Sequence, residues 1–249
     1  MHETGREQRL AALRERIGGL ERDAGAGARP PLPFGIPAID RHLPGGGLRR
    51  AALHEVVETG PSAGHAALAA LFVGGLLARL DGPVLWCLAG RDLFAPGLAA
   101  VGLHPDRVLY AETRRDAEVL PTMEEGLRHG RLAAVVGEAA RVGLTASRRL
   151  QLAAEGGGTL ALVIRRWREG VAGEPSAAAT RWGVAAAPSP ASAPGLTRAR
   201  WSLALLRARG AEPRTWLVEA PDAKGRLHLP ADLADRPRAE EGPRHRAAR

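Results

Sequence analysis

Short apolar segments alternate with helical segments between residues 52 and 164, and this alternation restricts the fold more than any other feature. The predicted strands are residues 52–57, 84–89, 107–111, 132–136 and 159–164. The predicted helices between them are residues 63–80, 93–101, 115–129 and 145–154, and Pro121 is expected to mark the start of the third. Strands separated by helices of this length favour a parallel sheet with helices on both faces. We therefore predict an α/β domain.

The chain after residue 164 follows a different pattern. Three further strands are predicted, at residues 180–186, 198–207 and 214–219. Gly210 and Pro213 supply a turn between the last two, so these strands are expected to pair antiparallel. The SPASAPG stretch at residues 189–195 is typical of a mobile loop. The complete prediction is a mostly parallel central sheet flanked by helices, with an antiparallel C-terminal strand extension.

Both ends of the chain differ from the central domain, which we place at residues 34–235. Residues 1–24 are predicted to be a helical arm, because apolar residues recur at helical spacing among charged ones. This stripe consists of Leu10, Leu13, Ile17 and Leu20. It either mediates self-association, docks on another protein or packs against its own domain. A linker rich in Gly and Pro follows at residues 25–33, and residues 236–249 are predicted to be a disordered basic tail.

The composition is that of a globular protein, since 45% of the 249 residues are hydrophobic and 25% are charged. The longest strongly apolar run, residues 66–77, is shorter than the ~20 residues that cross a bilayer. The charged N-terminal residues do not resemble an export signal, so we expect a cytoplasmic protein with no membrane partner. Cys87 is the only cysteine, which excludes an internal disulfide and a multi-cysteine metal site.

Positive charge is concentrated in the second half of the chain. The formal net charge is +8, and residues 141–210 contain eleven arginines but only three glutamates. Residues 236–249 contain five more arginines and two glutamates. This distribution is typical of a surface that binds nucleic acid or an acidic partner, and it is equally typical of a solvated arginine-rich surface.

A glycine-containing turn follows the first predicted strand and leads directly into a helix, which is where α/β proteins place phosphate-binding loops. In a working loop of spacing Gly-x4-Gly-Lys-Ser/Thr, backbone N–H groups hold the phosphates, the lysine meets their charge and the hydroxyl holds Mg²⁺. Here Thr59, His65 and Ala66 occupy the first glycine, lysine and hydroxyl positions. Gly60 and Gly64 remain within this degenerate loop.

Two further positions lack residues that ATP hydrolysis requires. The residue after the predicted strand 132–136 is Gly137 rather than an aspartate. The segment after strand 84–89 offers Asp92 but no glutamate to orient a water molecule. We therefore predict no catalytic residues, no ATP hydrolysis, no cofactor and no metal, although the backbone of the loop could still bind an anion.

The order of motifs along the chain resembles the RecA-like recombinase core and, more specifically, the ImuA family. The matching segments are residues 32–40, the Gly-Gly-Gly-Leu turn within 43–48, the degenerate loop, MEEGL at 123–127 ahead of 132–138, and the ending at 216–219, 225–227 and 233–235. The resemblance covers about residues 30–236, and the ordered combination of these motifs carries it.

The resemblance implies a RecA-like accessory protein of an SOS-induced mutagenesis cassette. Such a protein would link the recombinase RecA, an ImuB-like polymerase-related protein and, indirectly, an error-prone C-family polymerase during translesion synthesis. It would be cytoplasmic and associated with the nucleoid after DNA damage. Two alternatives remain open: a divergent RecA-like DNA-dependent ATPase, and a single-stranded DNA-binding module.

Arginines and tryptophans near the predicted strand ends are the candidate contacts for DNA or a protein partner. Arg165, Arg166 and Arg168 follow strand 159–164 at the sheet edge where α/β proteins bind ligands, and in a RecA-like core this edge leads into a DNA-binding loop. The other candidates are Trp167, Arg181, Trp182, Arg198 and Arg200. A tryptophan stacked on a single-stranded base would contribute about 1–3 kcal/mol, whereas a tryptophan within strand 180–186 is more often part of the core. A solvated turn or a charged edge strand would account for the arginines equally well.

Several other reactive side chains are predicted to be structural. His54 and His65 have no second metal ligand at helical spacing. Cys87 is expected to act as a small hydrophobic residue in a buried strand. Glu124 and Glu125 are expected to form a solvated helix face rather than an acid–base pair.

Overall fold

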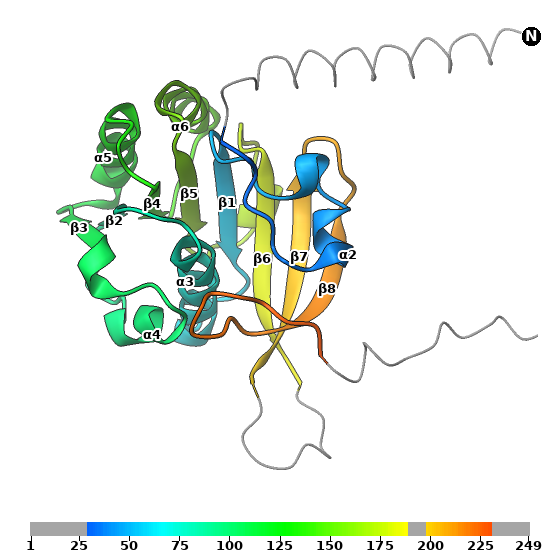
Figure 1. Ribbon diagram of the computed structural model, residues 1–249. Coiled ribbons are helices and arrows are strands. Elements are labelled where there is room, and N and C mark those ends of the chain that lie inside the picture. Colours follow the sequence, from blue (N-terminus) through cyan, green and yellow to red (C-terminus); the bar gives the residue numbers. More distant parts are fainter. Residues whose placement is uncertain (1–28, 189–197, 231–249) are drawn as a thin grey trace, which may run out of the picture.

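The computed structural model describes residues 29–188 and 198–230, which form one sheet with helices on both faces (Figure 1). Four predicted features lie wholly or partly outside the described residues: the N-terminal arm with its leucine and isoleucine stripe, residues 25–28 of the linker, the loop at 189–195 and the C-terminal tail. Within the described residues, no helix is both long enough and apolar enough to cross a membrane.

The sheet has eight strands in the order β3-β2-β4-β5-β1-β6-β7-β8. They are β1 (Leu53–Glu58), β2 (Val84–Leu88), β3 (Val108–Glu112), β4 (Ala134–Ala139), β5 (Leu160–Arg165), β6 (Thr180–Ala187), β7 (Arg200–Ala208) and β8 (Arg214–Glu219). Strands β1 to β6 pair in parallel, and β7 and β8 continue the sheet antiparallel. The predicted parallel sheet with an antiparallel C-terminal extension is confirmed.

The helices divide between the two faces. The α-helices are α2 (Pro37–Asp40), α3 (Ala63–Ala78), α4 (Ala95–Ala100), α5 (Asp116–Arg128) and α6 (Leu144–Gly157), and short 3-10 turns lie at Pro44–Gly46, Pro105–Arg107 and Val171–Gly173. One hydrophobic core lies between the sheet and α2, α3 and α4, and a second lies between the sheet and α5 and α6. Alternate strand residues serve the two cores, as pleated strands require: Val56 faces α3, whereas Leu53 faces α6.

Aromatic side chains form the centre of the first core. Trp182 on β6 is fully buried, and its ring lies 4.9 Å from that of Phe34 and 6.2 Å from that of Trp216. The core interpretation of Trp182 is therefore confirmed, and stacking of this residue on a base is excluded because the ring has no exposed face. The segment before β1 crosses β7 and β8 on this side (Figure 1), where the ring of His42 meets Trp216 edge-on.

The Gly-Gly-Gly turn ahead of β1 has a specific structural role. Gly45 and Gly46 adopt φ angles of 79° and 80°, which favour glycine. A Cβ atom at Gly47 would lie 2.4 Å from the carbonyl oxygen of Leu32, which pairs with Leu48 across the turn. The turn thus allows the chain to close on itself before it enters the sheet.

Strand β4 begins and ends later than predicted, and this shift changes the site. Gly137 lies inside the strand, and Glu138, the next residue, takes a position near its carboxyl end. A Cβ atom at Gly137 would lie 2.1 Å from the sulfur of Met123 on α5, so glycine is required for close packing between helix and strand. The glycine interrupts the apolar run without ending the strand.

The prediction that the third helix begins at Pro121 is wrong, because α5 begins five residues earlier and contains Pro121. The carboxylate of Glu118 accepts hydrogen bonds from the backbone N–H of Arg114 at 3.2 Å and from Nε of Arg115 at 2.8 Å. These bonds stabilise the first turn, although Pro121 cannot donate a helical hydrogen bond of its own.

The prediction of a solvated face for the two adjacent glutamates of α5 is correct for Glu125 and wrong for Glu124. The Glu125 side chain is 81% exposed. Glu124 is buried and pairs with Arg128 one turn later and with Arg149 of α6 at 2.6 Å. Because Arg149 comes from the neighbouring helix, Glu124 joins α5 to α6.

Candidate functional site

The carboxyl ends of β4, β5 and β1 lie side by side in the sheet and meet the segment that follows β2. In α/β folds this edge is where ligands bind, because the loops leave the sheet there and helix N-termini point toward it. Helix α3 begins at this edge, and Gly64, His65 and Ala66 of the degenerate phosphate loop lie in its first turn.

Four charged side chains from separate segments meet at this edge, and we call them the edge cluster: Glu58, Asp92, Glu138 and Arg166. The guanidinium of Arg166 lies 3.2 Å from Glu58 and 2.8 Å from Asp92, and it also pairs with Glu138. Trp86 donates a hydrogen bond of 2.7 Å to Glu138. The backbone N–H of Trp167 donates one of 2.8 Å to Glu58. Arg166 therefore links three strand ends at one point.

The edge cluster carries excess negative charge, since three carboxylates surround one guanidinium. Burial raises the pKa of Glu138 above its usual value, and the attraction of Arg166 only partly offsets this effect. Burial alone would lower the pKa of Arg166, but the charges of Glu138, Asp92 and Glu58 raise it above its usual value. Arg166 thus remains a firmly protonated centre of the cluster.

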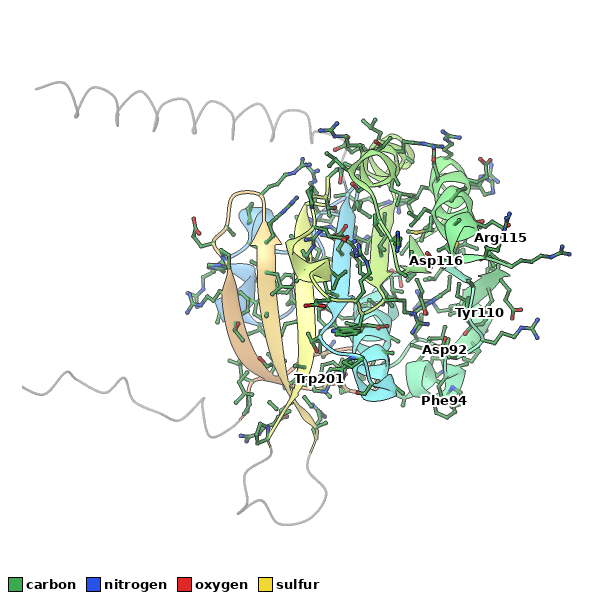
Figure 2. The ribbon with its side chains drawn as sticks, turned by 180° about the vertical axis from the view of Figure 1, so that it is seen from behind. Asp92, Phe94, Tyr110, Arg115, Asp116 and Trp201 are labelled. Carbon is green, nitrogen blue, oxygen red and sulfur yellow. The ribbon has the colours of Figure 1, made fainter. Side chains whose placement is uncertain are left out.

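A cavity of about 180 Å³ adjoins the edge cluster on the α3 face of the sheet. Its acidic end is formed by the cluster, and its walls are mainly small or apolar: Ala63, Ala66, Ala67, Ala70, Leu71, Leu93, Phe94, Gly97, Leu98 and Ile164. Phe94 is 71% exposed and lies close to Asp92 at one end of the molecule (Figure 2). The site is therefore a small apolar pocket that ends in carboxylates.

The degenerate phosphate loop is occupied by one of its own side chains. The Nδ1 atom of His65 lies 2.7 Å from the hydroxyl of Ser62, and the imidazole covers Gly60, where a Cβ atom would lie 2.6 Å from the ring. Thr59 donates its hydroxyl hydrogen bond to the carbonyl of Val184. The side chains of Thr59, Ser62 and His65 in this loop therefore already have hydrogen-bond partners within the protein. Within residues 29–188 and 198–230, no group of three His, Cys, Asp or Glu side chains is arranged to hold a metal ion.

A second ionic cluster lies on the opposite face of the sheet and corrects two predictions. Arg165 and Arg181 are 0% and 2% exposed, so the predicted contact of these residues with external DNA or protein is wrong. Arg181 pairs with Glu55 at 2.6 Å, and Arg165 pairs with Glu55 at 3.7 Å and with Glu174. In a parallel strand, neighbouring residues face opposite sides, which separates Arg165 from Arg166.

The remaining predicted contact residues lie at the same sheet edge but are not gathered into one site. Trp167 is 42% exposed, and Arg168 pairs with Glu174. Arg198 lies 3.9 Å from Glu219, and Arg200 begins β7 opposite Ala187 at the carboxyl end of β6. External contacts of Arg166, Trp167, Arg168, Arg198 and Arg200 stay predictions.

His54 is structural, as predicted. Its Nε2 donates to the carbonyl of Arg49 at 2.8 Å, so Nδ1 accepts from the hydroxyl of Thr180 at 2.7 Å. The same hydroxyl accepts a hydrogen bond of 2.8 Å from Trp182. Burial lowers the pKa of His54 to about 4 and keeps the ring neutral. Cys87 is also buried, as expected, and burial raises the pKa of its thiol to about 12.

Sequence reasoning did not select Glu58 and Glu138 as site residues. Each stands near the carboxyl end of a buried strand, and a carboxylate at the ligand-binding edge of a parallel sheet is the signal that could have identified them. The fourth strand was predicted to end at residue 136, which placed Glu138 in a loop rather than near the end of a strand.

The arrangement of strands and the site at their carboxyl edge define a RecA-like α/β protein. A search with protein-family models finds no match. Among solved structures, the RadB recombinase superimposes with a TM-score of 0.53 at 18% identity, covering 80% of this chain and 99% of that one. SulA from Pseudomonas aeruginosa matches 46% of this chain and 98% of its own at 28% identity, with a TM-score of 0.41.

Sequence comparison then places the chain more narrowly. Protein ImuA from two strains of Caulobacter vibrioides is 39% identical over 229 residues, which cover 84% of this chain and 94% of that protein. The chain belongs to the ImuA family.

Proposed function

We propose that this chain is a non-catalytic, RecA-like accessory protein of SOS-induced translesion synthesis. In this role it links the recombinase RecA with an ImuB-like polymerase-related protein and, through it, with an error-prone C-family polymerase. It acts in the cytoplasm and joins the nucleoid after DNA damage. Membership of the ImuA family supports the biological setting. The chemistry of the sheet edge supports a role in binding rather than in catalysis.

One observation carries the non-catalytic part of the proposal: the loop that would hold phosphate is covered by its own histidine and lacks the residues that meet the phosphates and the metal. The loop supplies His65 and Ala66 where a lysine and a metal-binding hydroxyl are required. His65 also covers Gly60, where phosphate would approach the backbone.

The proposal is tested with purified full-length protein and purified partners. We expect binding to RecA and to the ImuB-like protein in pull-down and light-scattering experiments, with no DNA-stimulated release of phosphate from ATP. Absence of binding to both partners would refute the accessory role. Mg²⁺-dependent binding of ATP with turnover would instead establish the divergent ATPase.

Direct contact with single-stranded DNA is a second candidate function, and the exposed ring of Trp167 favours it. This ring follows Arg166 at the ligand-binding edge, and such pairs of aromatic and cationic residues stack on bases and neutralise phosphates. We expect Trp167→Ala to weaken binding to an oligonucleotide about tenfold, with Leu152→Ala at an exposed leucine of α6 as control. Equal affinity of both variants, or no dependence on salt, would exclude this candidate.

A further inference from the structure

The cavity beside the edge cluster combines apolar walls with a carboxylate end, and the proposed accessory role makes no use of it. We propose that this cavity binds an arginine side chain, and that the occupant comes from the chain's own C-terminal segment, residues 236–249. The proposal is independent of the recombinase and the polymerase.

The shape of the cavity suits a long side chain with a charged tip. The first two turns of α3 contribute only alanines to its wall, namely Ala63, Ala66, Ala67 and Ala70, and these small side chains leave the space open. Leu71 and Phe94 add apolar surface. The methylene groups of an arginine can pack along such walls while the guanidinium reaches the polar end.

The charge at the end of the cavity selects a cation. Arg166 neutralises only one of the three carboxylates. Glu58 and Glu138 are buried and already have hydrogen-bond partners, whereas the side chain of Asp92 is 62% exposed and, among the described residues, pairs through Oδ1 alone. A second guanidinium would therefore pair with Asp92, and the negative charges of Glu58 and Glu138 would add to the attraction.

The composition of the segments outside the described residues selects the occupant. Residues 1–28 carry five arginines and five acidic residues, and residues 189–197 carry no charged residue. Residues 231–249 carry five arginines and four acidic residues, and all five arginines fall within residues 236–249, where only two glutamates accompany them, so the excess positive charge lies there. The chain's single lysine lies elsewhere, at position 224, which makes arginine the cation available.

The geometry of the chain permits this contact. After β8, Pro221 and Gly225 pack against Gly75 of α3, which places the last described segment on the same face of the sheet as the cavity (Figure 1). The 19 residues after Pro230 can extend about 60 Å. A domain of this size has a radius of gyration of about 16 Å, so the segment reaches the cavity without strain.

A spin label tests the contact in the full-length chain. Cys87 is buried and its thiol is not ionised at neutral pH, so a nitroxide attaches selectively to the variant Ala247→Cys. We expect paramagnetic broadening of the amide signals of Ala66, Ala67 and Phe94 to be at least fivefold greater than that of Thr145 on α6. The broadening should decrease at high salt, because it depends on a contact between charges.

Matched variants separate the proposed contact from chance proximity. Asp92→Asn and replacement of the five tail arginines by glutamine should each remove most of the broadening. Glu112→Gln, at a half-exposed glutamate on the edge strand β3, should leave it unchanged. Broadening that persists without the tail arginines, or that never exceeds the value at Thr145, overturns the proposal. If broadening appears only in the signals of unlabelled chains mixed with labelled ones, the tail binds the cavity of a second copy. That result overturns the intramolecular contact.

Discussion

The indole Nε1 of Trp86 donates a hydrogen bond of 2.7 Å to Oε1 of Glu138, and both side chains are buried. Trp86 belongs to β2 and to the hydrophobic core, whereas Glu138 ends at the cavity. The other oxygen of Glu138 pairs with Arg166. The edge cluster is therefore attached to the core, and changes in it should alter folding stability as well as binding.

Removing the central cation should destabilise the fold. Arg166→Gln would leave three carboxylates facing one another at a largely buried position, where loss of one partner of an ion pair costs about 3 kcal/mol. Urea unfolding followed by tryptophan fluorescence measures the change. Arg91→Gln, which breaks the exposed pair with Glu112, is the control and should cost less than about 1 kcal/mol. Equal costs for the two variants would contradict a structural role for the cluster.

The stability contributed by Glu138 should depend on pH. Because burial raises the pKa of Glu138, the folded state holds its proton more tightly than the unfolded state. Ionisation of Glu138 as the pH rises above about 4.5 therefore lowers the free energy of unfolding of the parent chain. Glu138→Gln has no ionisable group at this position, so its free energy of unfolding does not fall for this reason. The free energy of unfolding of the variant, relative to the parent, should rise between pH 4.5 and pH 7. An identical trend for Glu125→Gln, at an exposed glutamate, would show that the effect is not specific to this site.

The buried histidine should produce the opposite dependence. Burial lowers the pKa of His54 to about 4, so between pH 6.5 and pH 4 the unfolded chain binds a proton that the folded chain does not. The parent should therefore lose about 2–3 kcal/mol of stability between pH 7 and pH 4.5 from this residue alone. An NMR titration of the His54 ring in the folded chain provides the direct measurement, and a midpoint near 6.5 would refute the assignment.

Close packing of β4 against α5 should make Gly137 intolerant of a side chain. Gly137→Ala places a Cβ atom 2.1 Å from the sulfur of Met123, and such overpacking costs about 1–3 kcal/mol. Gly143→Ala is the matched control, because no atom lies within 4 Å of the added Cβ and its φ is −68°. Thermal unfolding of the two variants distinguishes them, and equal melting temperatures would mean that Met123 moves aside at no cost.

The elements of the fold were largely predictable from local patterns. The predicted strand at residues 84–89 is found as β2, because a continuous apolar run between turns is typical of a strand buried on both faces. The predicted start of α5 was wrong, because the residues before Pro121 have tertiary partners: Val119 packs in the second core, and Asp116 accepts a hydrogen bond from the backbone N–H of Ala140. The predicted ends of the strand around Gly137 were wrong for a related reason. Glycine is needed there because of its close contact with Met123 on α5, which no pattern of neighbouring residues indicates.

The candidate site was predictable only in part. Replacement of the lysine and hydroxyl of a phosphate loop by His65 and Ala66 can be identified by spacing alone. The burial of Arg165 and the exposure of Trp167 could not be deduced, because their environments depend on which strands and loops cover them.

The sequence by itself determined which segments form strands and helices, though not all of their ends, and which residues of a phosphate loop are missing, because hydrophobic periodicity and motif spacing act between near neighbours in the chain. Tertiary structure alone decided that Glu58 and Arg166, 108 residues apart, share an ion pair with Glu138 and Asp92. Their meeting requires β4, β5 and β1 to become adjacent, and that order depends on the packing of the whole sheet.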